Sequence, residues 1–301
     1  MANAIEVRGL RKSYGDVEAV RGIDLSVAEG TVFALLGPNG AGKTTTVEIL
    51  EGFRARTAGE VSVLGYDPAR RDRALRAHVG IVLQSTGVDP YLTVAETVEL
   101  YGGYYEHPRP LDEVIEVVGL TEKRDTRVLK LSGGQQRRLD VAIALAGDPK
   151  LLFLDEPTTG FDPGARRNAW EVVKNLQALG KTIFLTTHYM DEAQYLANLV
   201  AVIAQGKIVA EGPPRTLGGR DLAGTLIRFR VPDGAEGLPQ VGAIPSADGT
   251  VEIRTDDPTR VLYELTSWAV ERGQRLTGIE VARPTLEDVY LELTGAEEGR
   301  T

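Results

Sequence analysis

A lysine and a hydroxyl group at the end of a glycine-rich segment are the strongest chemical signal in the sequence. Residues 37–45 read Gly-Pro-Asn-Gly-Ala-Gly-Lys-Thr-Thr, so Gly37, Gly42, Lys43 and Thr44 have the spacing of a phosphate-binding loop. Glycines let backbone N–H groups converge on phosphate oxygens, because no Cβ atom is in the way. The segment predicts that Lys43 binds the β- and γ-phosphates of a nucleotide and that the Thr44 hydroxyl ligates Mg²⁺.

Two neighbouring carboxylates and a histidine follow apolar runs further along the chain. Asp155 and Glu156 come directly after Leu151–Leu154, and His188 comes after the run 182–187. Open α/β sheets place functional groups at the carboxyl ends of their strands. We therefore expect Asp155 to hold Mg²⁺ and Glu156 to orient or polarise the attacking water. His188 can form a hydrogen bond to a γ-phosphate.

Three further signals are weaker when each is taken alone. Tyr14 could stack on adenine, or it could be an ordinary exposed tyrosine in a turn. Gln84 ends an expected strand and could reach Mg²⁺ or the attacking water, or it could cap the loop. Ser132 with Gly133, Gly134 and Gln135 precedes an amphipathic helix. That helix start could bind phosphate, or it could be an ordinary serine cap.

Alternating and continuous apolar runs indicate the strands and helices that must position these residues. The phosphate loop stands between an expected strand at 32–36 and a helix with Val47, Ile49, Leu50 and Phe53 on one face. Other strands are expected at 5–8, 23–27, 60–63, 79–83, 151–154 and 182–187, with a hairpin formed by 200–203 and 207–209. Helices are expected at 93–101, 111–118 and 172–179. The block 90–147 reads as a mainly helical insertion between core strands.

A smaller unit is expected from about residue 216, after Gly212-Pro213-Pro214. Alternating residues predict strands at 227–231, 250–254 and 279–281, and a helix is expected at 258–272. Thr285 and Asp288 have capping-box spacing and predict a last helix. The order ββαβα predicts a small α+β sandwich that contains no phosphate loop and no cluster of catalytic residue types.

Composition excludes some classes of protein and disfavours others. The chain has 301 residues, a net charge of −9 and no cysteine. It has no apolar run near the ~18 residues that a membrane-spanning helix needs, and its N-terminus does not read as a secretory signal. The absence of cysteine means that no disulfide holds the fold, which fits the cytosol. The acidic balance disfavours a nucleic-acid partner.

Taken together, these segments resemble the ABC ATPases. Residues 37–45 resemble the Walker A motif, Leu131–Gln135 the LSGGQ signature, and Leu151–Glu156 the Walker B motif with its catalytic glutamate. Gln84, His188 and Tyr14 fall where that family has its Q-loop, its switch histidine and its adenine-stacking aromatic residue. The resemblance covers roughly residues 4–215. It departs from the usual pattern at Phe161, where the family usually has leucine, and we expect altered packing at a dimer contact there.

The resemblance implies an α/β fold built on an ABC-type P-loop ATPase core, with an antiparallel β subdomain and a helical subdomain at about 90–147. It places the nucleotide-binding domain at 1–215 and a small C-terminal α+β accessory domain at 216–301. The implied cofactors are ATP and Mg²⁺, with Thr44, Gln84 and Asp155 as metal ligands. The implied catalytic residues are Glu156, His188, Lys43 and Gln84. The implied nucleotide contacts are Tyr14, Gly37, Pro38, Asn39, Gly40, Ala41, Gly42, Lys43, Thr44, Thr45, Ser132, Gly133, Gly134 and Gln135.

The resemblance also implies partners. One set of motifs per chain implies a second ATPase subunit, in a homodimer where Ser132 of one subunit faces the phosphate loop of the other. The stretch 283–290 is similar to the tail of ATP-binding subunits of drug-resistance exporters of the type 2 export family. This implies a protein at the cytoplasmic face of the cell membrane, held by an integral-membrane permease that exports drugs or other lipophilic compounds. The alternative is a soluble ABC-type ATPase that acts on nucleic acid or the ribosome.

Overall fold

The computed structural model describes residues 2–82, 87–219, 224–231, 238–239, 244–245, 250–282, 285–288 and 290. The chain forms two compact units, Met1–Pro214 and Arg215–Thr301. Each unit has its own sheets and is described by itself. Gln84 lies outside the described residues, as do Arg283, Pro284 and Val289 of the tail motif.

A six-stranded sheet forms the centre of the first unit, in the order β5-β6-β7-β3-β8-β9. Its strands are β3 (Val32–Leu36), β5 (Val79–Val82), β6 (Leu151–Asp155), β7 (Thr182–Thr187), β8 (Leu199–Ala204) and β9 (Lys207–Gly212). All neighbours are parallel except β8 and β9, which form the expected hairpin. Every residue of β3, β6 and β7 is buried, as the continuous apolar runs predicted.

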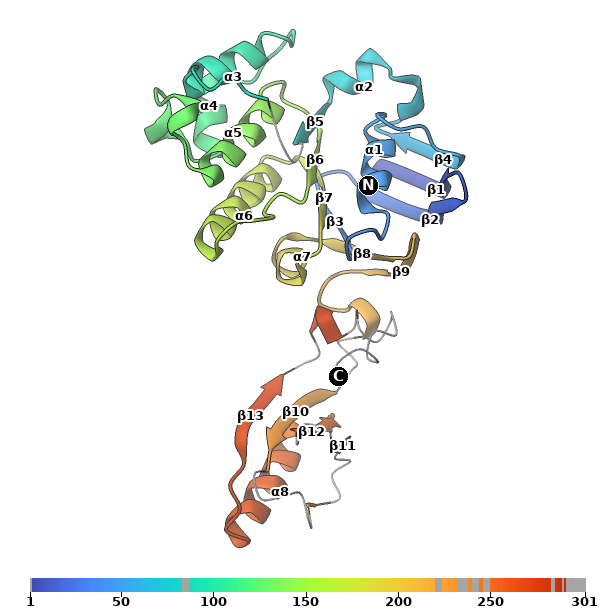
Figure 1. Ribbon diagram of the computed structural model, residues 1–301, viewed down its shortest axis with the longest axis vertical. Helices are drawn as coiled ribbons and strands as arrows, with labels where there is room; N and C mark the ends of the chain where they lie inside the picture. The colour runs from blue at the N-terminus through green and yellow to red at the C-terminus, as the bar shows by residue number, and fades with distance from the viewer. Residues whose placement is uncertain are drawn as a thin grey trace. The chain divides into compact units, whose positions relative to one another are not determined.

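A three-stranded antiparallel sheet, in the order β2-β1-β4, lies beside the central sheet (Figure 1). It consists of β1 (Asn3–Tyr14), β2 (Val17–Ala28) and β4 (Ala58–Val63). The strands predicted at 5–8 and 23–27 are present but extend well beyond those limits. Their outer parts are largely exposed and pair with register shifts, so they lack a regular apolar alternation. Ile5, Leu10 and Ile23 share one apolar core with Phe33 and Leu35 of the central sheet.

Helices α3 (Val94–Gly102), α4 (Leu111–Val117) and α5 (Gly133–Leu145) gather on the side of the central sheet away from β1, β2 and β4 (Figure 1). Two of them begin with a complete capping box. Thr93 and Glu96 cap α3, and Ser132 and Gln135 cap α5 through reciprocal hydrogen bonds. The helices predicted at 93–101 and 111–118 are therefore confirmed.

The remaining helices of the first unit are α1 (Lys43–Leu50), α2 (Arg73–Ala77), α6 (Pro163–Ala178) and α7 (Met190–Leu196). The helix predicted at 172–179 is present as α6, but the predicted start is wrong because the helix begins at Pro163. Asp162 caps the helix and Pro163 takes its first position, but the polar residues that follow hide the helical period. The short helices α2 and α7 were not predicted. No helix in the described part is both long and apolar enough to cross a membrane.

The second unit has a four-stranded antiparallel sheet in the order β11-β12-β10-β13 and one long helix. Its elements are β10 (Thr225–Arg230), β11 (Ile244–Pro245), β12 (Thr250–Thr255), α8 (Pro258–Glu271) and β13 (Thr277–Ala282). Phe229 and Ile253 of the sheet pack with Leu265 and Trp268 of α8 in a separate core. The predicted strands and helix are present, and β11 is additional. Thr285 and Asp288 form the expected capping box, but most of the helix predicted after them lies outside the described residues.

Candidate functional site

The glycine loop between β3 and α1 is shaped by close packing. A Cβ atom at Gly37 would lie 2.3 Å from the Ile203 carbonyl oxygen, and one at Gly42 would lie 2.6 Å from that of Ala19. Gly42 also has a φ of 107°, which strains any other residue. The loop borders a cavity of about 390 Å³ lined by Ala19, Asn39, Gly40, Gly42, Lys43, Thr44, Thr45 and Glu156. The motif therefore holds its backbone open around a space that can receive phosphates.

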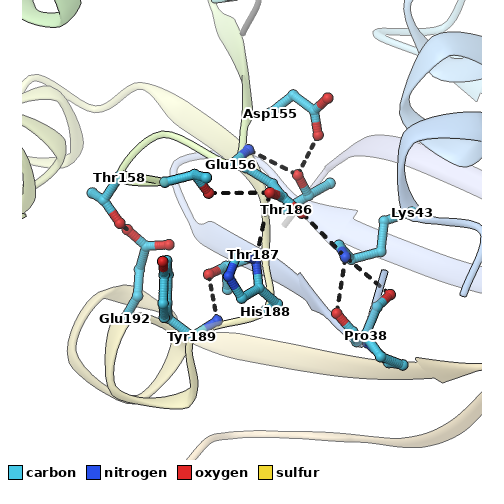
Figure 2. Close-up of polar contacts among 12 residues, drawn as sticks. Pro38, Lys43, Asp155, Glu156, Thr158, Thr186, Thr187, His188, Tyr189 and Glu192 are labelled. Atoms are coloured by element: carbon cyan, nitrogen blue, oxygen red, sulfur yellow. Dashed lines mark hydrogen bonds and ion pairs between the residues drawn. The ribbon is translucent and has the colours of Figure 1, made fainter. Parts of the chain in front are cut away.

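Lys43 is buried at the base of this loop, with only 4% of its surface exposed. Its Nζ atom donates to the carbonyl oxygens of Gly37 at 2.9 Å and Pro38 at 3.1 Å. The same atom lies 3.2 Å from Oε1 of Glu156 (Figure 2). The ammonium group therefore lines the loop cavity and pairs with the carboxylate of the residue directly after β6.

One threonine of β7 holds both the carboxylate of Asp155 and the backbone N–H of Glu156. Oγ1 of Thr186 donates to Oδ1 of Asp155 and accepts the Glu156 N–H at 3.0 Å. Burial raises the pKa of Asp155, and the charge of Glu156 raises it further. Glu156 has a φ of 44°, in the left-handed region that residues other than glycine seldom occupy. Thr186 therefore stabilises a strained turn between the two acidic groups.

The Glu156 carboxylate sits between two nitrogen groups. Besides Lys43 at Oε1, its Oε2 atom lies 3.4 Å from Nδ1 of His188 and accepts a hydrogen bond from Thr159 Oγ1 at 3.0 Å. Burial raises the pKa of Glu156, but Lys43, Thr159 and His188 outweigh it and bring the pKa below its ordinary value. Glu156 is therefore ionised at neutral pH and can act as a proton acceptor.

The structure brings the phosphate loop, Glu156 and His188 together, but it does not bring all the candidate residues to this cavity. Tyr14 ends β1 and is 40% exposed, with the cations of Lys12 and Arg54 at 4.9 Å and 5.2 Å from its ring centre. It does not line the loop cavity, and nor do residues 132–135 at the start of α5. Gly133 and Phe161 instead line a second cavity of about 610 Å³ that also reaches Glu156.

Some residues that shape the site were not found by sequence reasoning. Thr186 is visible only as a polar residue in an apolar strand, and Thr159 only as part of a loop. Arg137 of α5 is buried and donates to the backbone oxygens of Asp155 at 3.1 Å and Pro157 at 3.4 Å. In the sequence, Arg137 stands out only because it directly follows the Ser132–Gln136 segment. That position does not indicate that its side chain binds the backbone of Asp155 and Pro157.

Sequence comparisons agree with this geometry. A family profile described as ABC transporter matches residues 20–159. A second profile, for the C-terminal domain of ABC transporter domain-containing protein-like proteins, matches residues 225–285. The Nod factor export ATP-binding protein I of Rhizobium sp. (strain N33) is 40% identical over 303 residues, which cover 98% of both chains. The daunorubicin resistance ATP-binding protein DrrA2 of Streptomyces coeruleorubidus is 40% identical over 308 residues, covering 97% of this chain and 95% of that protein.

Solved structures resemble the first unit in fold. The ADP conformation of MJ1267, an ATP-binding cassette of an ABC transporter, has a TM-score of 0.62 at 25% identity and covers 71% of this chain and 92% of its own. The dimeric post-hydrolysis state of the cassette MJ0796, bound to ADP and Pi, has a TM-score of 0.61 at 26% identity, covering 69% and 98%. CbiO1 from Clostridium perfringens, part of the cbiONQ complex, has a TM-score of 0.65 at 29% identity, covering 71% and 90%.

The predicted ABC ATPase fold is thus confirmed, and the nucleotide of this fold is ATP or ADP. The relatives match over nearly the whole chain, including the second unit, and neither they nor the solved structures support the nucleic-acid alternative. The protein is an ATPase that belongs to the family of ATP-binding subunits of ABC transporters.

Proposed function

We propose that this ATPase drives an exporter, working as a pair of identical subunits that enclose ATP between them. The observation that carries the proposal is that Lys43 and His188 both contact the carboxylate of Glu156, which lines the phosphate-loop cavity with Lys43. The relatives are named for Nod factor export and daunorubicin resistance. Their names support the proposal that the energy of ATP hydrolysis is used to export drugs or other lipophilic compounds.

The contacts of the site suggest how its residues act on ATP. Lys43 donates hydrogen bonds to two loop carbonyls and pairs with Glu156. When ATP binds, Lys43 would donate charge-assisted hydrogen bonds to the β- and γ-phosphates in place of its ion pair with Glu156. Glu156, freed from that ion pair, would then accept a proton from the attacking water. His188, next to Glu156, would stabilise the negative charge that develops on the transferred phosphoryl group.

The donor set also fits a magnesium ion. Asp155 and Thr44 supply oxygen atoms, the ligand type that Mg²⁺ prefers, and Gln84 is the third proposed ligand. In the described part of the chain, no group of three or more His, Cys, Asp or Glu side chains is placed to hold a metal ion. Mg²⁺ takes one or two protein carboxylates and completes its shell with phosphate and water, and Asp155 would supply the carboxylate here. The bound ion would neutralise phosphate charge.

The arrangement of the signature segment supports a dimer. Ser132, Gly134 and Gln135 begin α5 but do not line the loop cavity of their own subunit. We propose that they contact the γ-phosphate held by the partner subunit, while Tyr14 stacks on the adenine within its own subunit. The dimeric form of the MJ0796 cassette is consistent with this arrangement.

A groove beside the helical group supports a permease contact. A cavity of about 350 Å³ is lined by Leu50, Leu75 and Ile81, together with Tyr101 of α3 and Tyr104, which follows α3. Tyr104 is 76% exposed, and its ring centre lies 6.1 Å from that of Tyr101, so the two rings form an aromatic pair at the edge of this groove. We propose that the region from Gln84 to residue 105 binds a membrane permease, which would hold the protein at the cytoplasmic face of the membrane.

The nucleotide assignment has a direct test in Lys43→Ala. Loss of the ammonium group removes a charge-assisted contact to phosphate, so ATP affinity should fall at least about tenfold, which corresponds to roughly 1.4 kcal/mol. Isothermal titration calorimetry with the full chain measures the affinity, and Lys130→Ala is a matched control on an exposed lysine. An unchanged affinity in Lys43→Ala would mean that the loop does not bind the phosphates.

A further inference from the structure

Glu192 of α7 has a fully buried carboxyl group, and none of the roles proposed above for the ATP site involves it. Its exposed fraction is 0%, and it lies in the first turn of α7, four residues after His188. It does not line the phosphate-loop cavity. Burying a carboxyl group is costly unless its contacts compensate, so the contacts of Glu192 call for an explanation.

One oxygen of Glu192 joins three segments of the chain. Oε1 accepts hydrogen bonds from Thr158 Oγ1 at 2.8 Å and from Trp170 Nε1 at 3.1 Å. Thr158 stands two residues after Glu156 and is 1% exposed, and Trp170 belongs to α6. Figure 2 shows Glu192 beside Thr158, on the same side of the site as His188. Glu192 therefore ties the loop after β6 to both α6 and α7.

The other oxygen, Oε2, is buried and has no hydrogen-bond partner in the described part of the chain. Burial raises the pKa of Glu192, and the hydrogen bonds from Thr158 and Trp170 offset only part of that rise. A glutamine would keep an acceptor at the position of Oε1. It would place its amide group where Oε2 now has no partner.

Helices α6 and α7, which carry Trp170 and Glu192, are joined by further side-chain contacts. Trp170 stacks on Tyr195 with ring centres 5.0 Å apart. Arg166 lies 4.1 Å from the centre of the Tyr189 ring and pairs with Asp191 at 3.2 Å. Tyr189 and Asp191 flank the start of α7, directly after His188, so the histidine segment is anchored to α6.

We propose that Glu192 is a positioning residue for ATP hydrolysis, which holds Thr158 and thereby fixes the Glu156 carboxylate relative to His188. The strained backbone of Glu156 persists only if its surroundings hold it. Thr186 holds it from β7, and the Glu192–Thr158 bond holds the chain on its other side. This inference rests on the role proposed for Glu156 above.

The test compares Glu192→Leu with Glu192→Gln in the full-length protein. Glu192→Leu removes the acceptor, and kcat for ATP should fall roughly ten- to hundredfold, because a misplacement of about 1 Å can cost that much. KM should stay within about twofold of wild type, since Lys43 and the loop are untouched. Glu192→Gln should restore most of kcat. Thr158→Val, which removes the donor and keeps the shape, should reproduce the loss. A wild-type kcat in either Glu192→Leu or Thr158→Val overturns the proposal.

Trp170 supplies a readout that needs no turnover. The chain has two tryptophans, and Trp268 Nε1 has no hydrogen-bond partner in the described part, so Trp268→Phe removes no described hydrogen bond. In that background, the emission of Trp170 should shift with Glu192→Leu and stay in place with Glu192→Gln. An emission maximum that does not move with Glu192→Leu contradicts the contact on which the proposal rests.

Two outcomes separate this inference from the proposed function. Full activity in Glu156→Gln would remove the proposed role of Glu156, whatever Glu192 does. An inactive Glu156→Gln together with a wild-type Glu192→Leu would overturn only the inference. If Glu192→Leu does not fold, Thr158→Val decides, because it leaves the Glu192–Trp170 bond in place.

Discussion

At the scale of single residues, Glu51 at the end of α1 has a strongly perturbed carboxyl group. Burial, followed by the charges of Asp155 and Glu48, raises its pKa from 4.5 to about 8. Its side chain has no hydrogen bond or ion pair in the described part of the chain. Glu51 lines the groove beside α3, and its ionisation works against the fold.

The raised pKa of Glu51 predicts a pH dependence of stability. Between about pH 4.5 and 8 the unfolded chain releases this proton and the folded chain keeps it, so the contribution of Glu51 to stability falls as the pH rises. Glu51→Gln removes this loss. In nucleotide-free buffer, its stability relative to wild type should increase from pH 5 to pH 8 by up to about 1.4 kcal/mol per pH unit. Urea unfolding measures this, with the exposed Glu122→Gln as control. A difference that does not change with pH would contradict the burial of a protonated Glu51.

Residue types and spacing were enough to predict Lys43, Asp155, Glu156 and His188 as one site, because each follows a strand or loop whose pattern is plain. The sequence could not predict that Thr186 holds the Asp155 carboxylate and the Glu156 backbone N–H, or that Glu156 has a positive φ. Those features depend on the register between β6 and β7, where Asp155 pairs with Thr186. Such long-range pairing leaves no local pattern.

At the scale of elements, two helices of the helical group start with the same capping box. In α3, Thr93 accepts the Glu96 N–H at 3.2 Å, and in α5, Ser132 accepts the Gln135 N–H at 3.3 Å. The two N-caps should stabilise their helices by similar amounts, about 1 kcal/mol each. A functional difference between them therefore cannot come from capping alone.

This pair gives a matched test of the signature segment. Ser132→Ala and Thr93→Ala should each lower stability by about 1 kcal/mol. If Ser132 makes the proposed contact to the γ-phosphate held by the partner subunit, Ser132→Ala alone should also lower ATP hydrolysis, roughly tenfold or more. Phosphate release and urea unfolding measured on both variants decide this. Equal hydrolysis in the two variants would assign Ser132 to capping only.

Buried strands were the elements that the sequence predicted best, since β3, β6 and β7 are continuous apolar runs with no exposed face. The first turns of α6 were missed because Arg166, Arg167 and Asn168 face outward or only half inward, which leaves no apolar period. The helix α7 was missed because its seven residues include a buried glutamate, where a pattern search expects an apolar residue.

At the scale of the whole molecule, the chain combines an ATPase unit with a second unit that has its own core. The nucleotide-binding candidates all lie in the first unit. We propose that the second unit supports dimer formation, whereas the alternative is an appendage whose apolar residues only fill its own core. The relatives match over nearly the whole chain, which shows that the two units occur together in them.

Removal of residues 216–301 separates these possibilities. Nucleotide binding through Lys43 and Tyr14 should remain within about twofold, because the loop and its neighbours lie upstream. Dimer formation with ATP should weaken at least about tenfold if the second unit contributes to assembly. Sedimentation velocity of the truncated and full-length chains with ATP measures this, and equal dimer affinity would favour the passive appendage.

The central claim is that Glu156 acts on the attacking water within an ATP-closed dimer, and Glu156→Gln tests it most directly. Glutamine keeps the size of the side chain but removes the carboxylate that accepts the proton. ATP should still bind, phosphate release should fall about a hundredfold or more, and a dimer should accumulate with ATP in light scattering. A variant that releases phosphate at the wild-type rate and stays monomeric with ATP would contradict the claim.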